Sequence, residues 1–357
     1  MVRDLWHYPR TSLAEQILGL FVSNLSSSFI FFAPRRMGKT EFLRKDIQPI
    51  AEKMGWNVMY FSFLDCDDKV QERFIVALSE FSEVIGACKN RLTHVKKVGA
   101  EVVGFKTEIE WYKNEQEITL HKIFSDLAKK KKILLLLDEV QVLTKYPNAH
   151  LFIASIRTAL DMYKDQIKVI FTGSSREGLR QMFSQSDAPF FHFGQNIPFP
   201  ELERGFIEHL SKIFHKATQR RLDTAELWNV FIEFEKVPQL MRSFVERLVL
   251  YPNLNMEEAK KQVLQDIMQD RAFIEQWNTI SNLEQLLLKK IALGDDKLFS
   301  ELQSQQIAKA LGISKIPISS IQSALRVLQR KNYIGKLSKQ GQYYIEDPNF
   351  KSWLLSS

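Results

Sequence analysis

Three neighbouring residues, Gly38, Lys39 and Thr40, could bind the phosphates of a nucleotide. They end the stretch A-P-R-R-M-G-K-T at 33–40, which follows an apolar run and precedes a segment with helical spacing. A strand, a short loop and a helix form the context in which Gly-Lys-Thr becomes a phosphate-binding loop. Its backbone N–H groups would bind the β-phosphate, Lys39 would add a cation for the β- and γ-phosphates, and Thr40 would offer a hydroxyl to Mg²⁺. The predicted nucleotide contacts in this loop are Pro34, Arg35, Arg36, Met37, Gly38, Lys39, Thr40 and Glu41.

Two adjacent carboxylates, Asp138 and Glu139, follow five consecutive aliphatic residues at 133–137. Such a run fits a strand that is buried on both faces of a parallel sheet, and these sheets bind ligands at the carboxyl ends of their strands. There, Asp138 would hold Mg²⁺ and Glu139 would act as the catalytic residue that polarises the attacking water. By itself, this pair of carboxylates is weak evidence for an ATPase site. Together with the phosphate-binding loop, it becomes specific evidence.

A third apolar run, at 167–172, ends in Gly173-Ser174-Ser175. We expect it to form a strand between the two motifs, which is where P-loop ATPases with a catalytic glutamate carry a sensor of the γ-phosphate. Ser174 is the first candidate for that catalytic role and Thr172 is the second. A strand end that only caps the next helix would explain the same residues.

Length and composition indicate a globular protein with more than one domain, since the chain has 357 residues and a hydrophobic content of 45%. No apolar stretch is as long as a membrane span, and the first residues lack the pattern of a signal peptide. The two cysteines, Cys66 and Cys88, form neither a disulfide framework nor a metal-binding spacing. We therefore expect a cytoplasmic protein in a reducing environment, without contact to a membrane.

Strands are expected at 29–32, 56–63, 133–137 and 167–172, with helices between them. This alternation predicts a parallel α/β layer. A nucleotide-binding core would cover 1–198, with a hairpin inserted at about 92–113, and the proline-containing segment 196–200 would end it. A helical lid at 199–255, a long connecting helix at 256–281 and a further domain at 282–357 would follow.

The last domain has the pattern of a winged helix. Helices are expected at 283–293 and 304–311 and from Pro317 onward, followed by two strands on either side of a basic tip at 338–341. The third helix would bury an apolar stripe and present a polar face, whose members could meet phosphates and base edges. The stripe consists of Ile318, Ile321, Leu325 and Leu328. The candidate DNA contacts are Ser319, Gln322, Arg326 and Arg330, with Lys339 at the tip.

Charge also distinguishes this part of the chain. The whole chain carries a net charge of +7, and residues 281–357 hold eleven basic and six acidic residues, which leaves +5. A basic surface favours binding to a polyanion such as duplex DNA. Winged helices also dock on proteins, however, and polar helix faces are commonly just solvated, so both alternatives stay open.

The order of these parts resembles the archaeal-type ATPase family, in the MNS clade of the STAND branch of P-loop NTPases. The resemblance spans nearly the whole chain and rests on four stretches. It implies an AAA-like α/β P-loop NTPase of the additional-strand catalytic-glutamate type, with a helical lid and a C-terminal winged helix. It also implies ATP and Mg²⁺ as ligands and ATP hydrolysis as the reaction. The stretches are P-R-R-M-G-K-T at 34–40, L-L-L-L-D-E-V-Q at 134–141, F-T-G-S-S at 171–175 and D-P-N-F-K-S-W-L at 347–354.

This sequence departs from the family pattern at several positions. Ala33 stands where the first glycine of the loop is usual, and Lys236-Val237-Pro238 replaces Gly-x-Pro near the adenine, so that only Pro238 carries over. Gln195 stands where a basic residue is frequent. An arginine acting in trans within a homo-oligomer is therefore less certain, and the candidates for it are Arg176, Arg180 and Arg242.

Two functions fit these observations. The first is a nucleotide-dependent switch or motor that acts on DNA through the winged helix. The alternative is an ATP-gated scaffold that binds a protein partner, for example as a defence or signalling sensor, with slow or no hydrolysis. A nuclease is disfavoured, because His192, His209 and His215 are scattered and no further cluster has metal-binding spacing.

Overall fold

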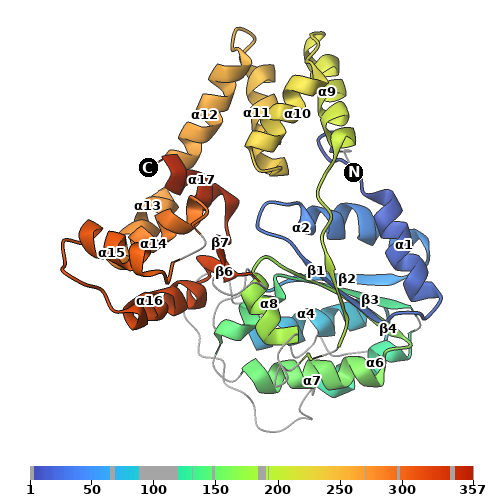
Figure 1. Cartoon of the computed structure of the whole chain (residues 1–357). Coiled ribbons are helices and arrows are strands. Elements are labelled where there is room, and N and C mark those ends of the chain that lie inside the picture. The colour runs from blue at the N-terminus through green and yellow to red at the C-terminus, as the bar shows by residue number, and fades with distance from the viewer. Residues whose placement is uncertain are drawn as a thin grey trace, which may run out of the picture.

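The computed structural model describes residues 4–64, 69–87, 120–130, 132–146, 149–183, 190–191, 193–269, 271–295, 298–337 and 342–356. The hairpin predicted at about 92–113, both cysteines and the tip residue Lys339 lie outside these residues. Figure 1 shows a sheet with helices on both faces, a group of helices above it, and a third group beside it that ends at the C-terminus.

A five-stranded parallel sheet with the order β2-β3-β4-β1-β5 forms the centre of the first part. The strand β4 pairs with both β1 and β3, as predicted for the strand that precedes Ser174. It therefore brings its carboxyl end between the two motifs. The strands are β1 (Ser28–Phe32), β2 (Asn57–Ser62), β3 (Ile133–Asp138), β4 (Ile167–Gly173) and β5 (Gln195–Pro198).

The fifth strand was not expected from the sequence. Residues 196–200 were predicted as a break between domains, yet β5 pairs in parallel with β1. The proline-containing sequence argues against a central strand, whereas an edge strand tolerates Pro198 because one side of its backbone needs no partner.

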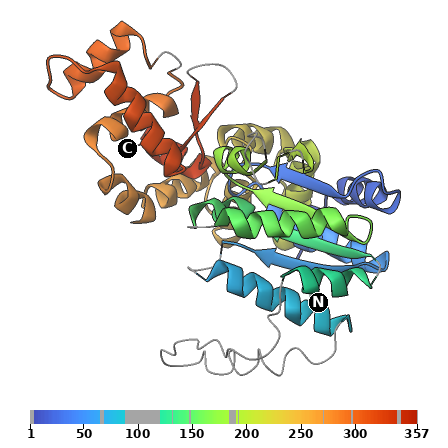
Figure 2. The same ribbon diagram turned by 90° about the horizontal axis from the view of Figure 1, so that it is seen from below.

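Helices cover both faces of the sheet, and Figure 2 shows the face that carries α4, α6 and α7. Alternate residues of β1 point to opposite faces, since Phe29 and Phe31 join one apolar cluster and Ile30 joins the other. All six residues of β3 are buried. One face carries α1 (Thr11–Val22), α2 (Lys39–Glu41), the π-helix η1 (Phe42–Ile47) and α3 (Gln48–Lys53). The other carries α4 (Val70–Val84), α6 (Leu120–Ala128), the 3-10 helix η2 (Val140–Lys145), α7 (Ala149–Met162) and α8 (Arg176–Phe183).

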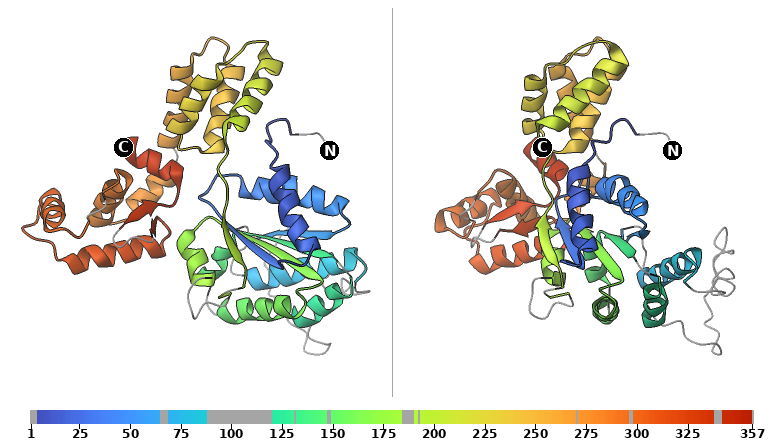
Figure 3. Two further views of the ribbon diagram at one scale, coloured as in Figure 1. Left: turned by 45° about the vertical axis from the view of Figure 1, so that its right-hand side comes forward. Right: turned by 90° about the vertical axis from the view of Figure 1, so that its right-hand side faces the viewer.

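The second group stands above the sheet (Figure 3). It contains α9 (Arg204–Thr218), α10 (Thr224–Glu233), α11 (Pro238–Leu250) and α12 (Met256–Met268). The prediction of one long connecting helix at 256–281 was wrong, because α13 (Arg271–Asn278) is separate from α12. The helix α12 ends where the carbonyl of Met268 accepts a hydrogen bond from the indole N–H of Trp353 at 3.2 Å.

Three helices, two antiparallel strands and a last helix make up the third group. The helix α15 begins earlier than expected, because the Ser300 hydroxyl caps it by accepting from the Gln303 N–H. Ile321, Leu325 and Leu328 are buried as predicted. The prediction for Ile318 was wrong, since this first residue of the helix is 46% exposed. The elements are α14 (Asn282–Ala292), α15 (Glu301–Ala310), α16 (Ile318–Arg330), β6 (Ile334–Lys336), β7 (Tyr343–Ile345) and α17 (Pro348–Ser356).

One apolar cluster runs through all three groups, from Phe21 of α1 through Phe244 of α11 to Trp353 of α17. The groups are therefore packed against one another. In the part of the chain that the structure describes, none of the helices combines the length and the apolar character needed to span a bilayer.

Candidate functional site

The predicted phosphate-binding loop connects β1 to α2 at the carboxyl end of the sheet. Arg36 and Gly38 adopt left-handed backbone conformations, with φ of 65° and 88°. Glycine is the residue that takes this conformation with the least strain. Ala33 has no such conformation, so replacing the usual glycine with alanine at this position costs no backbone strain.

Lys39 is the buried cation of this loop, with 4% of its surface exposed. Its ammonium donates hydrogen bonds to the carbonyl oxygens of Ala33 at 2.7 Å and Pro34 at 2.9 Å. Burial lowers the pKa of Lys39, and the carboxylates of Glu139 and Asp138 oppose this shift. The lysine is thus held against the loop, between two backbone carbonyls and two acids.

Asp138 receives three hydroxyl donors at the end of β3. Thr40 donates to Oδ2 at 2.5 Å, Tyr60 donates to the same oxygen at 2.9 Å, and Thr172 donates to Oδ1. Burial and the charge of Asp138 raise the pKa of Tyr60. The strand order therefore brings together Thr40 and Asp138, the two residues predicted to hold a metal ion.

The oxygen atoms of Thr40 and Asp138 are suitable ligands for Mg²⁺. This ion prefers hard oxygen ligands and is commonly bound by one or two protein groups together with nucleotide phosphates. The hydroxyl of Thr40 and the carboxylate of Asp138 are such ligands. Among the residues that the structure describes, no cluster of three or more His, Cys, Asp or Glu side chains could hold a metal ion. A site completed by a nucleotide is consistent with both observations.

Glu139 follows at the start of η2, in a left-handed conformation with φ of 55°. Its Oε2 accepts one hydrogen bond from the Ser174 hydroxyl at 2.6 Å and another from the Gln141 amide at 2.5 Å. Its backbone N–H donates to the hydroxyl oxygen of Thr172 at 3.4 Å. The carboxylate is therefore held at the carboxyl end of β4.

The three hydroxyls at the end of β4 have different partners. Thr172 is fully buried and holds Asp138, whereas Ser174 holds Glu139. The helix α8 is capped by Ser175, whose hydroxyl accepts from the Gly178 N–H at 3.1 Å. Helix capping therefore explains Ser175 and does not explain Ser174.

Two residues at the site were missed by sequence reasoning, namely Tyr60 and Gln141. Tyr60 lies on β2 beside β3, where strand pairing sets Tyr60 opposite Leu136. Gln141 stands two residues after Glu139 and is 5% exposed. Its position in the D-E-V-Q stretch was the only signal for it, and no sequence pattern indicated its partners.

Other loop residues have contacts of different kinds. Met37 is buried in the core, whereas the Arg36 guanidinium donates to the Asp347 carboxylate at 2.5 Å, next to α17. Glu41 pairs with Lys45 at 2.6 Å and lies 3.5 Å from His7. Asp46 of η1 bonds the other ring nitrogen of His7 at 2.8 Å, so that the N-terminal segment is tied to the helix that follows the loop.

Pro238, the residue predicted to lie near the adenine, is the first residue of α11. Glu235 and Lys236, just before it, have left-handed backbones with φ of 50° and 54°. Lys236 therefore takes the conformation for which the family's glycine is suited. Its ammonium pairs with Glu201 at 2.6 Å.

Among the arginines considered for a role in trans, Arg242 is engaged within its own chain. Its guanidinium donates to Glu246 at 2.8 Å, lies 3.9 Å from Asp4 and covers the ring of Trp6 at 5.6 Å. Arg176 and Arg180 belong to α8, at the carboxyl end of the sheet.

The candidate DNA contacts Ser319, Gln322, Arg326 and Arg330 are all exposed on α16. This helix runs along the lower edge of the C-terminal group in Figure 1. These residues do not join the phosphate-binding loop, so they would form a separate surface.

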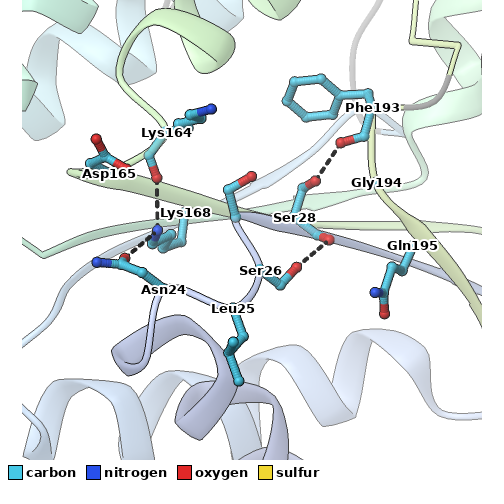
Figure 4. Close-up of a pocket in the computed structure, with 11 residues that line it drawn as sticks. Asn24, Leu25, Ser26, Ser28, Lys164, Asp165, Lys168, Phe193, Gly194 and Gln195 are labelled. Atoms are coloured by element: carbon cyan, nitrogen blue, oxygen red, sulfur yellow. Dashed lines mark hydrogen bonds between the residues drawn. The ribbon is translucent and has the colours of Figure 1, made fainter.

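A cavity of about 390 Å³ lies at the opposite, amino ends of the strands. Figure 4 shows Lys168 of β4 at this place, where its ammonium donates to the Asn24 side-chain oxygen and the Lys164 carbonyl, both at 2.8 Å. Lys168 is 2% exposed, and burial lowers its pKa. None of the predicted site residues lines this cavity.

Comparisons with solved structures identify the fold. The Walker-type ATPase PABY2304 of Pyrococcus abyssi matches with a TM-score of 0.67 and 16% identity, over 98% of this chain and 99% of that chain. The ORC2 protein of Aeropyrum pernix, solved as ADPNP–ADP complexes, matches with a TM-score of 0.58 and 14% identity, over 98% and 96% of the two chains. Together with the parallel sheet, these matches show an α/β P-loop NTPase fold.

Sequence comparisons add no closer relative. No model of a protein family matches the chain, and no curated protein matches it by sequence. At 14–16% identity the structural matches establish the fold alone.

Proposed function

We propose that this protein binds Mg-ATP and hydrolyses it, and that it acts as a nucleotide-dependent switch on duplex DNA. The observation that carries the proposal is the convergence of Lys39, Thr40, Asp138, Glu139 and Ser174 at the carboxyl ends of three neighbouring strands. The residues come from three separate stretches of sequence, so chance similarity in one motif does not account for it.

Each residue would have a defined part in the reaction. Lys39 and the loop N–H groups would bind the β- and γ-phosphates, and Pro238 would lie near the adenine. Thr40 and Asp138 would hold Mg²⁺, which neutralises charge on the phosphate oxygens. Glu139 would accept the proton of the attacking water, and Ser174 would donate to the γ-phosphate.

We further propose that residues 282–357 form a winged helix, as in the MNS clade of archaeal-type ATPases. Three helices followed by an antiparallel pair of strands support this assignment. Exposed Arg326 and Arg330 on α16 support contact with DNA phosphates.

Contacts between the part that carries the phosphate-binding loop and the C-terminal group support the switch. Arg36 of the phosphate-binding loop pairs with Asp347, and Ser175 donates to the Asn332 side chain at 3.1 Å just before β6. Arg36 belongs to the phosphate-binding loop, and Ser175 directly follows Ser174 at the carboxyl end of β4. Nucleotide binding that moves either residue would therefore change how the C-terminal group is held.

The test is ATP turnover measured with and without duplex DNA, with DNA binding followed over a series of salt concentrations. We expect turnover that responds to DNA, and an affinity that falls steeply with salt. Replacing Arg326, Arg330 and Lys339 with alanine should weaken binding to all sequences and lower the salt slope by about one unit for each lost phosphate contact. Unchanged affinity and slope would contradict the DNA proposal.

One observation favours the alternative of an ATP-gated scaffold for a protein partner. Ile313 and Ile318, on either side of the turn between α15 and α16, are each 46% exposed. Apolar side chains at this place suit a protein surface better than a phosphate backbone. ATP binding without turnover, together with no binding to duplex DNA, would favour this function.

A further inference from the structure

We propose that Gln141 is a positioning residue that orients both Glu139 and Ser174 for ATP hydrolysis. The proposal rests on the proposed ATPase function and assigns a role to a residue that does not itself touch ATP. Glu139 and Ser174 follow different strands and bond each other directly, and Gln141 is a third group that bonds both of them.

The hydrogen bonds provide the first argument. The amide nitrogen of Gln141 lies 2.5 Å from Oε2 of Glu139 and 3.2 Å from the hydroxyl oxygen of Ser174. An amide NH₂ group has two hydrogens, so it can donate to both oxygens at once. Gln141 therefore connects the predicted base to the predicted sensor directly.

The packing around Gln141 provides the second argument. A Cβ atom added to Gly173 would lie 2.5 Å from the Gln141 side-chain oxygen, and one added to Gly178 would lie 2.7 Å from its Cβ. Neither glycine has a left-handed backbone. Glycine is therefore needed at these two positions because the Gln141 side chain occupies the space that a Cβ atom would fill. The end of β4 and the start of α8 thus enclose the glutamine and fix its rotamer.

Gln141 can also hold both residues in place when a phosphate arrives. The Ser174 hydroxyl has one proton, which it donates to Glu139 in this structure. If that proton turns to the γ-phosphate, Ser174 no longer holds the carboxylate. Gln141 can still donate to Glu139 and to the Ser174 oxygen, so it would keep both residues in place during the reaction.

The test compares Gln141→Leu with the wild type in ATP turnover and in ATP affinity. Leucine has a similar size but no donor, and a misplaced catalytic group costs about 10- to 100-fold in kcat. We expect that loss in kcat, with a Kd for ATP that changes by less than about threefold because the phosphate-binding loop is untouched. Thr144→Ala is the matched control, since Thr144 lies in the same helix and, within the described residues, its hydroxyl donates to the Gln141 backbone carbonyl and to no side chain of the site.

Two further variants separate positioning from a general structural role. In a Glu139→Gln background, Gln141→Leu should lower the residual single-turnover rate by a smaller factor than in the wild-type background, because the Glu139 carboxylate is gone and only Ser174 is left for Gln141 to orient. Gly178→Ala keeps the glutamine but displaces it, and should also lower kcat more than ATP affinity.

The outcomes discriminate between the proposals. Turnover in the wild type with an equal kcat in Gln141→Leu would overturn this inference and leave the ATPase function standing. If Gln141→Leu lowered the turnover rate by the same factor in the Glu139→Gln background as in the wild-type background, the inference would be overturned as well. Absence of turnover in the wild type would overturn both.

Discussion

Two buried lysines occupy opposite ends of the same sheet. Lys39 follows β1 at the carboxyl end, and Lys168 lies in β4 near the amino end. They are 4% and 2% exposed, each donates to two oxygen atoms at 2.7–2.9 Å, and burial lowers the pKa of both. By these measures alone, either lysine could mark a site for an anion.

Their surroundings differ. Lys39 stands at the start of a helix beside Asp138 and Glu139, in a loop with left-handed backbone at Gly38. The acceptors of Lys168 are Asn24, in the turn before β1, and the carbonyl of Lys164, in the turn before β4. We propose that the first arrangement binds a phosphate and acts on it, whereas the second ties two turns together. Burial and a lowered pKa therefore do not define a site without catalytic neighbours.

The largest expected effect on ATP turnover comes from replacing Glu139, at the carboxyl end of the sheet. Glu139→Gln should lower ATP turnover by roughly 10²–10⁴-fold, the usual contribution of a general base. ATP should still bind, because the amide keeps the shape of the side chain. Single-turnover hydrolysis and calorimetry measure the two quantities. Wild-type turnover in the variant would show that Glu139 is not the base.

Lys39→Met should weaken ATP binding by about 100-fold, since hydrogen bonds to charged groups contribute about 1.5–3 kcal/mol each. Calorimetric titration with Mg-ATP measures the change. The fold should persist, and its far-ultraviolet circular dichroism should match that of the wild type. An unchanged affinity would contradict the assignment of the loop.

The same substitution of the buried lysine at the amino end of the sheet tests whether the two lysines differ. Lys168→Met should leave ATP affinity within about twofold of the wild type and lower the free energy of unfolding by about 1–2 kcal/mol, because two acceptors lose their donor. Urea unfolding gives the second value. A loss of ATP affinity comparable to that of Lys39→Met would mean that the two lysines do not differ as described.

The smallest effect should be a pH dependence of stability that originates near the loop. Although burial opposes it, hydrogen bonds to Asp46 and Glu41 raise the pKa of His7 from 6.5 to about 9. This contribution to stability is fully present below pH 6.5 and is lost as the pH rises through about 9. Urea midpoints should therefore fall between pH 7 and pH 10, and His7→Gln should flatten that decrease. An equal decrease in the variant would assign it to other groups.

The sequence allowed the carboxyl end of the sheet to be predicted well, because its residues lie in local patterns. Gly38-Lys39-Thr40 and Asp138-Glu139 each follow an apolar run, and parallel strands bring such ends together. Lys168 was not recognised, since a single lysine within the apolar run of β4 has no pattern of its own. Its partners are defined only by the turns that the fold places beside it.

The remaining differences come from contacts between distant segments. Gln141 acquires its surroundings from Gly173 and Gly178, which follow it by more than thirty residues. Arg36 meets Asp347 only after the C-terminal group has packed against the core. Ile318 carries the correct spacing for the apolar stripe, yet as the first residue of α16 it extends beyond the core.

The most direct test of the account is ATP turnover by three proteins under identical conditions: the wild type, Lys39→Met and Lys168→Met. We expect Mg²⁺-dependent turnover by the wild type, nearly the same rate for Lys168→Met, and at least about a 100-fold lower rate for Lys39→Met at an ATP concentration near the wild-type KM. Equal turnover by wild type and Lys39→Met, or no turnover by any of the three, would contradict the assignment of an ATPase site to the carboxyl end of this sheet.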